Sequence, residues 1–133
     1  MRPNDFGKSK LLIVEDDFLI AHTIQMAAQK AGIEVIGKAT KMDEALILCR
    51  QIKPDFATMD VKLKDDISGF EVARVLEEEY GVPSFFISAF RNELPPACAE
   101  LETCLGWIDK PFSAPQLKLR FEAILTVLMQ KSA

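Results

Sequence analysis

The stretch that decides the fold is Leu11-Leu12-Ile13-Val14-Glu15-Asp16-Asp17, in which four apolar residues are followed directly by three acidic ones. A continuous apolar run this short is typical of a strand buried on both faces of a parallel sheet. After the acids, apolar residues recur at helical spacing from Ile20 to Ala31, and Gly32 provides a helix end. We therefore predict a strand, an acidic loop and a helix in this order.

The same cycle of apolar run, polar stop and amphipathic segment recurs along the chain. The first strand covers residues 10–14, and the later predicted strands span residues 34–39, 56–59, 82–87 and 105–108. The later predicted helices span residues 43–52, 69–80, 95–101 and 114–130. Alternating strands and helices imply right-handed crossovers and helices on both faces of the sheet. The predicted fold class is α/β, a doubly wound parallel sheet of five strands with five helices.

Composition indicates one domain without a basic surface, preceded by a flexible tail at residues 1–8. The chain has 133 residues and a net charge of −4, so direct binding to nucleic acid is not expected, because phosphate backbones need a basic footprint. Its apolar runs are far shorter than the ~20 residues that span a bilayer, so membrane association is not expected. Three cysteines without paired spacing predict unpaired thiols and a cytoplasmic location.

Polar residues stand where the predicted strands end. Glu15 and Asp16 follow the first strand, Asp60 ends the third, Ser88 ends the fourth and Lys110 follows the fifth. In a parallel sheet these ends share one edge, where open α/β sheets bind ligands. Clustered carboxylates need a cation to offset their repulsion, and their oxygen atoms suit Mg²⁺. An aspartate at such an edge can act as a nucleophile toward phosphorus, with the hydroxyl and the ammonium binding phosphoryl oxygens.

In this order, the residues resemble the response regulator receiver family, which shares the fold of the bacterial chemotaxis response regulator. The resemblance runs from Lys10 to about Lys131. It rests on four pieces, which are Leu11–Asp17, Pro54–Asp60, Ser88-Ala89 and Lys110-Pro111-Phe112. It implies a flavodoxin-like sheet with the strand order 2-1-3-4-5, and a single receiver domain over residues 9–133 with no output domain after it.

The resemblance also implies a role for each site residue. Asp60 stands at the position of the phosphoacceptor, and Asp16 at that of a direct metal ligand. Glu15 corresponds to the acid that holds the metal ion through water. The backbone carbonyl of Lys62 corresponds to the third protein ligand of Mg²⁺ or Mn²⁺. Lys110 matches the lysine that pairs with a phosphoryl oxygen.

Two more positions belong to the family's switch. Ser88 occupies the place of the Ser or Thr that contacts the phosphoryl group, and Trp107 that of an aromatic residue that is usually Tyr or Phe. The Lys110–Pro111 bond is expected to be cis, an isomer that X-Pro bonds adopt at low cost. Asp17 is expected to be a helix-start acid, and His22, the single histidine, a surface residue.

The function that the resemblance implies is a phosphorylation switch rather than an enzyme. A histidine kinase or a histidine phosphotransfer protein would donate its phosphoryl group to Asp60, and the chain would catalyse only its own phosphorylation and dephosphorylation. The signal would pass to a downstream protein by contact, or the chain would act as a phosphate sink. The family also pairs as homodimers, through the face that helix 95–101, strand 105–108 and helix 114–130 would form here.

The loop at residues 61–69 departs from the family pattern, because Lys64 stands where proline is usual and the loop is one residue longer. This departure leaves open a receiver fold that is not phosphorylated and acts as an interaction module. Phosphatases of the haloacid dehalogenase type fit less well, because their typical motif has an Asp two residues after the nucleophile. This chain has Lys62 at that position. Flavin binding of the flavodoxin type is disfavoured because acids, which repel phosphate, follow the first strand.

Overall fold

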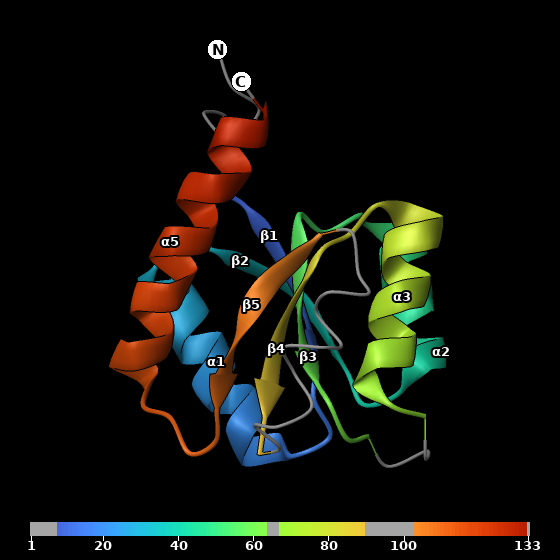
Figure 1. Ribbon diagram of the computed structural model, residues 1–133, viewed down its shortest axis with the longest axis horizontal. Helices are drawn as coiled ribbons and strands as arrows, with labels where there is room; N and C mark the ends of the chain where they lie inside the picture. Colours follow the sequence, from blue (N-terminus) through green and yellow to red (C-terminus); the bar gives the residue numbers. More distant parts are fainter. Residues whose placement is uncertain (1–7, 64–66, 90–102, 133) are drawn as a thin grey trace.

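One parallel sheet organises the chain, and a computed structural model describes its residues 8–63, 67–89 and 103–132. The strand order is β2-β1-β3-β4-β5, as predicted (Figure 1). The strands are β1 (Lys10–Val14), β2 (Glu34–Ala39), β3 (Phe56–Asp60), β4 (Ser84–Ser88) and β5 (Cys104–Asp109). In the described ranges the helices are α1 (Phe18–Lys30), α2 (Met42–Gln51), α3 (Gly69–Tyr80) and α5 (Ala114–Ser132). The predicted helix at residues 95–101 lies outside the described residues.

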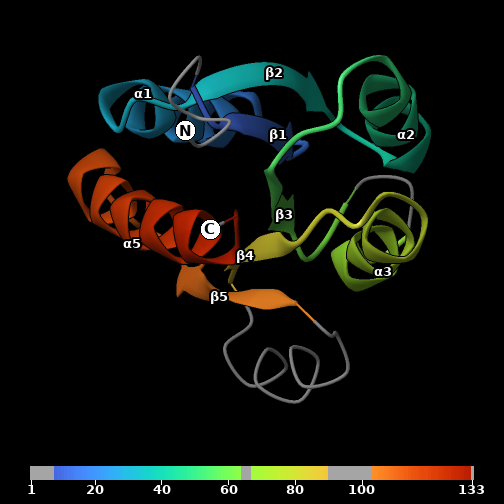
Figure 2. The same ribbon diagram turned by 90° about the horizontal axis from the view of Figure 1, so that it is seen from above.

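Helices cover both faces of the sheet, so the structure has three layers (Figure 2). One core lies between the sheet and helices α2 and α3, and we call it the α2–α3 core; its buried residues include Leu12, Met59 and Phe86. The other lies under helices α1 and α5, and we call it the α1–α5 core; it includes Phe56 and Phe121. Strands β1 and β3 contribute to both cores because successive side chains of a strand point to opposite faces.

The predicted boundaries of the elements in the described ranges agree with the structure to within two residues. The fourth strand begins at Ser84 rather than at Val82, because Pro83 between them has no N–H group to donate to a neighbouring strand. Helix α3 begins at Gly69, as predicted, after Ser68 accepts a hydrogen bond from the N–H of Glu71. The Lys110–Pro111 peptide bond is cis, as expected.

The prediction of three unpaired thiols is wrong. Cys104 is disulfide-bonded, whereas Cys49 is free and buried, and Cys98 lies outside the described residues. Spacing in the sequence did not reveal the bond, because a disulfide depends on how close two residues lie in space. Among the helices of the described ranges, none is long and apolar enough to cross a membrane.

Candidate functional site

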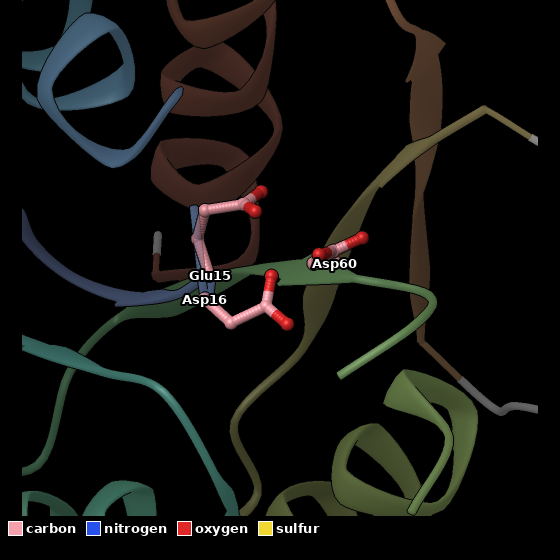
Figure 3. A group of neighbouring side chains, drawn as sticks. All are labelled: Glu15, Asp16 and Asp60. Atoms are coloured by element: carbon pink, nitrogen blue, oxygen red, sulfur yellow. The ribbon is translucent and has the colours of Figure 1, made fainter. Parts of the chain in front are cut away.

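Three carboxylates meet where β1 and β3 end, at the point where the strand order reverses (Figure 3). One oxygen from each of Glu15, Asp16 and Asp60 lies within 4.8 Å of the other two. Glu15 and Asp60 are buried, with 2% and 5% of their surface exposed, and Asp16 is half-buried. The sheet thus brings together the three acids that the sequence placed at strand ends, and their oxygens are the donors that Mg²⁺ prefers.

The position of Glu15 makes its negative charge costly in the absence of a cation. Burial, followed by repulsion from Asp60, raises the pKa of Glu15 from 4.5 to about 8, although Lys110 acts in the opposite direction. Its Oε1 atom is also buried without a hydrogen-bond partner among the described residues. A buried carboxyl group in this condition fits a nearby divalent cation, which would favour the charged form. The donor set therefore fits the metal that the sequence predicted.

Lys110 reaches the acids from the end of β5. Its Nζ atom lies 3.4 Å from Oδ1 of Asp60 and 3.6 Å from Oε1 of Glu15. The N–H group of Lys110 donates to the carbonyl oxygen of Ser88 at 2.8 Å, so the end of β4 holds the lysine backbone in place. The ammonium is thus fixed beside Asp60, where negative charge would gather in phosphoryl transfer.

Ser88 and Trp107 lie on neighbouring strands beyond the acids. Ser88 ends β4 and is fully buried; it directly follows Ile87, which pairs with Asp60 in the sheet. Trp107 is a half-buried residue of β5 that packs against the α2–α3 core. Its carbonyl oxygen accepts a hydrogen bond of 3.2 Å from Nη1 of Arg120. Ser88 therefore lies next to the site, and Trp107 lies one strand further along the sheet.

The loop after Asp60 is held by backbone contacts. Lys62 and Ser68 form an isolated antiparallel bridge, and the Gly69 N–H donates to the carbonyl oxygen of Val61 at 2.7 Å. The N–H of Lys62 itself donates to Oδ1 of Asp60 at 3.3 Å. The backbone of Lys62 is therefore in direct contact with the Asp60 carboxylate.

Gly69 is a residue whose importance the sequence analysis did not recognise. A methyl group built at its Cα atom would collide with the carbonyl oxygen of Asp60. The start of α3 therefore packs directly on the backbone of the residue that carries the carboxylate. A glycine immediately after the N-cap Ser68 was the available signal, because glycine is a poor helix former and needs a packing reason there.

The other residues considered from sequence have structural positions. Asp17 caps α1, with Oδ1 accepting hydrogen bonds from the N–H groups of Leu19 at 2.9 Å and Ile20 at 3.1 Å. This contact confirms Asp17 as a helix-start acid. His22 is exposed on α1, as expected. Lys64 lies outside the described residues.

A mostly apolar pocket of about 360 Å³ opens beside Lys110, and no sequence pattern indicated it. Its walls come from α1 and from the turn after β5, and they consist of Ile20, Thr23, Lys110, Pro111 and Phe112. Phe18 and Leu19 in the first turn of α1 are 78% and 74% exposed. The surface around Lys110 therefore combines a charged group with apolar side chains.

Comparisons with known proteins agree with this geometry. A family model described as "Response regulator receiver domain" matches residues 11–122. The "Uncharacterized transcriptional regulatory protein YbdJ" of Bacillus subtilis is 33% identical over 117 residues, covering 87% of this chain and 50% of that protein. The "Sensory transduction protein LytT" of Bacillus cereus is 28% identical over 109 residues, covering 81% of this chain and 44% of LytT. The chain thus spans about half the length of these relatives.

Solved structures show the same likeness. The response regulator PhyR from Brucella abortus superposes with a TM-score of 0.82 at 30% identity, over 93% of this chain and 50% of that chain. The signal receiver domain of a modulated diguanylate cyclase from Desulfovibrio desulfuricans G20 gives a TM-score of 0.79 at 25% identity, over 93% of this chain and 98% of that chain. This second match extends over nearly all of both chains.

Proposed function

The chain belongs to the response regulator receiver family, and on that premise we propose that Asp60 accepts a phosphoryl group from a phosphohistidine donor. The observation that carries the proposal is the convergence of Glu15, Asp16 and Asp60 with the ammonium of Lys110. A buried nucleophile beside a fixed cation, at the ligand-binding edge of an α/β sheet, is suited to phosphoryl transfer.

In the proposed reaction, an oxygen of the Asp60 carboxylate attacks the phosphorus atom. The N–P bond of the donor breaks, and its electron pair returns to the imidazole ring. Lys110 binds an oxygen of the phosphoryl group, and the Ser88 hydroxyl binds another. Hydrolysis of the acyl phosphate returns Asp60 to its free carboxylate. The chain thus promotes only its own phosphorylation and dephosphorylation, and we do not class it as an enzyme.

Asp16 and Asp60 are proposed to hold Mg²⁺ or Mn²⁺ directly, together with the backbone carbonyl of Lys62 and with Glu15 through water. When bound, the ion offsets negative charge on the phosphoryl oxygens and on the clustered acids. The carboxylate distances, the raised pKa of Glu15 and the contact of the Lys62 N–H with Asp60 support this ligand set.

The proposed phosphoryl donor is a histidine kinase or a histidine phosphotransfer protein. The phosphorylated chain would then contact a downstream protein, or it would act as a phosphate sink. Ser88 and Trp107 would change position with the state of Asp60. Pairing of two copies through the face of the predicted helix 95–101, β5 and α5 stays a prediction, as does the assignment of residues 9–133 to one receiver domain. The absence of nucleic-acid and membrane binding also stays a prediction. A cytoplasmic location stays one too, but the disulfide at Cys104 removes the support from unpaired thiols.

The test is phosphorylation by acetyl phosphate in the presence of Mg²⁺, read as intact mass. We expect the wild-type protein to gain one phosphoryl group, and Asp60→Asn to gain none while keeping its circular dichroism spectrum. Asp43→Asn, at an exposed position on α2, is the matched control and should behave as the wild type. Absence of uptake by the folded wild-type protein would instead favour a receiver fold that acts purely as an interaction module.

A further inference from the structure

Trp107 lies on the face of the sheet opposite to the one that simple strand alternation predicts. Leu105 packs against the α1–α5 core. Since side chains two residues apart in a regular strand share a face, Trp107 should lie there too. It packs against the α2–α3 core instead, and the next residue, Ile108, takes the α1–α5 side.

A bulge in β5 causes this reversal. Ser84 pairs with Cys104 and Phe86 pairs with Trp107, so β5 advances three residues while β4 advances two. Gly106 within the bulge has φ +111°, a conformation that glycine adopts without steric cost. Its N–H donates to the Cys104 sulfur at 3.4 Å. An extra residue of this kind redirects the side chains that follow it.

The reversal places Trp107 beside an aromatic pair that leads back to the site. Trp107 is the cross-strand partner of Phe86, and both side chains belong to the α2–α3 face. The Phe86 ring lies 5.1 Å from the Phe70 ring, measured between centroids, at an angle of 53°. Phe70 directly follows Gly69, which has no room for a side chain against the Asp60 carbonyl oxygen. One residue thus separates this aromatic pair from the backbone of Asp60.

We propose that Phe70, Phe86 and Trp107 form an aromatic row that couples the state of Asp60 to β5, and that the Gly106 bulge brings Trp107 into that row. The proposal rests on the phosphorylation of Asp60 proposed above. A change in the Asp60 backbone must move the start of α3, because the two are in contact without intervening side-chain atoms. The Phe70 and Phe86 rings are in contact, and Trp107 packs against the same core beside Phe86 in the strand pairing. A displacement of the start of α3 can therefore reach Trp107, since a close-packed core has little free volume to absorb it.

The opposite face of the sheet provides a matched control. Phe56 and Phe121 form an edge-to-face pair in the α1–α5 core, with ring centroids 5.8 Å apart. Trp107 does not belong to that face. Phe121→Leu and Phe70→Leu therefore each remove one ring from an aromatic pair, but only Phe70→Leu interrupts the row.

The test follows the fluorescence of Trp107, the single tryptophan of the chain, as beryllofluoride is added with Mg²⁺ as a phosphoryl mimic. Uptake from acetyl phosphate is measured separately by intact mass. We expect Phe70→Leu to take up the phosphoryl group as the wild type does but to lose the fluorescence change, and Phe121→Leu to keep both. A full fluorescence change in Phe70→Leu would overturn the proposal.

A second measurement does not depend on phosphorylation. Gly106→Ala and Gly32→Ala each place a side chain at a positive φ with space around it, but only Gly106 lies in the bulge. We expect the emission maximum and acrylamide quenching of Trp107 to change in Gly106→Ala and not in Gly32→Ala. Unchanged emission in folded Gly106→Ala overturns the role of the bulge.

If the wild type takes up no phosphoryl group, the proposed function fails while the row remains testable. Its packing is then judged from Trp107 emission in the unliganded variants. A change confined to Phe70→Leu supports the row, and unchanged emission in Phe70→Leu overturns it.

Discussion

The Nζ atom of Lys110 lies 3.4 Å from Oδ1 of Asp60, although 50 positions separate the two residues in the chain. They meet because β3 and β5 flank β4 and all three strands end at the same edge. The carbonyl oxygen of Ser88 at the end of β4 holds the N–H of Lys110. The end of β4 therefore positions Lys110, whose ammonium group lies beside the carboxylate of Asp60 on β3.

Loss of the Lys110 charge should slow phosphoryl uptake. We expect Lys110→Met to reduce the rate with acetyl phosphate by roughly 100-fold, since a fixed charge beside the reacting oxygens is removed. Lys110→Arg should recover part of the rate, because it keeps the charge with a different shape. Lys118→Met removes a lysine that pairs with Glu122 on α5 and should leave the rate unchanged. Equal rates for wild type and Lys110→Met would contradict this role.

The stability of the metal-free protein should depend on pH through Glu15. Its pKa is about 8 in the folded protein, against an ordinary value of 4.5, so between these values the folded state binds more protons than the unfolded state. The free energy of unfolding should therefore fall as pH rises through this window, by up to about 1.4 kcal/mol per pH unit. Urea unfolding at several pH values measures the slope.

Glu15→Gln is the control for this pH dependence, because glutamine keeps the shape and cannot titrate. Its free energy of unfolding should change less steeply over the same range, and an equal slope would rule out Glu15 as the source. Mg²⁺ should stabilise the wild type more near pH 8 than near pH 5, since the ion binds the deprotonated carboxylate.

Gly69→Ala should destabilise the protein strongly. The new methyl group would collide with the backbone oxygen of Asp60, which cannot move without displacing β3, and we expect a loss of about 3 kcal/mol in the free energy of unfolding. In Gly37→Ala the closest atom is Cδ1 of Leu48 at 2.9 Å, the end of a flexible side chain, so the loss should be smaller. Urea unfolding compares the two, and equal losses would count against a rigid contact at Gly69.

Asp16 and Asp17 are adjacent but should differ in their effects. Asp17→Ala removes the N-cap of α1 and should cost about 1 kcal/mol in the free energy of unfolding, while Mg²⁺ affinity stays unchanged. Asp16→Ala should weaken Mg²⁺ binding markedly, because it removes an oxygen from the acid cluster. Calorimetric titration with Mg²⁺ separates the two, and a large loss of affinity in Asp17→Ala would contradict the assignment.

Much of the fold could be predicted because its signals are local. The ranges Glu34–Ala39 and Gly69–Tyr80 were predicted as observed, since each combines an apolar pattern with clear polar or glycine stops. The start of β4 was predicted two residues too early. Pro83 interrupts the strand pairing there but leaves the apolar pattern of the sequence unbroken. The convergence of the site residues followed from a single topological rule, that parallel strands end on a common edge.

Local sequence was enough to order the elements and to place acids, a serine and a lysine at the strand ends, since periodicity and turn chemistry act over a few residues. Other features depended on segments far apart in the chain. The contact of Gly69 with Asp60, the raised pKa of Glu15 and the disulfide at Cys104 arise from distance and burial in three dimensions. The face of Trp107 was decided by a bulge, because one extra residue in β5 relative to β4 reverses every side chain that follows it.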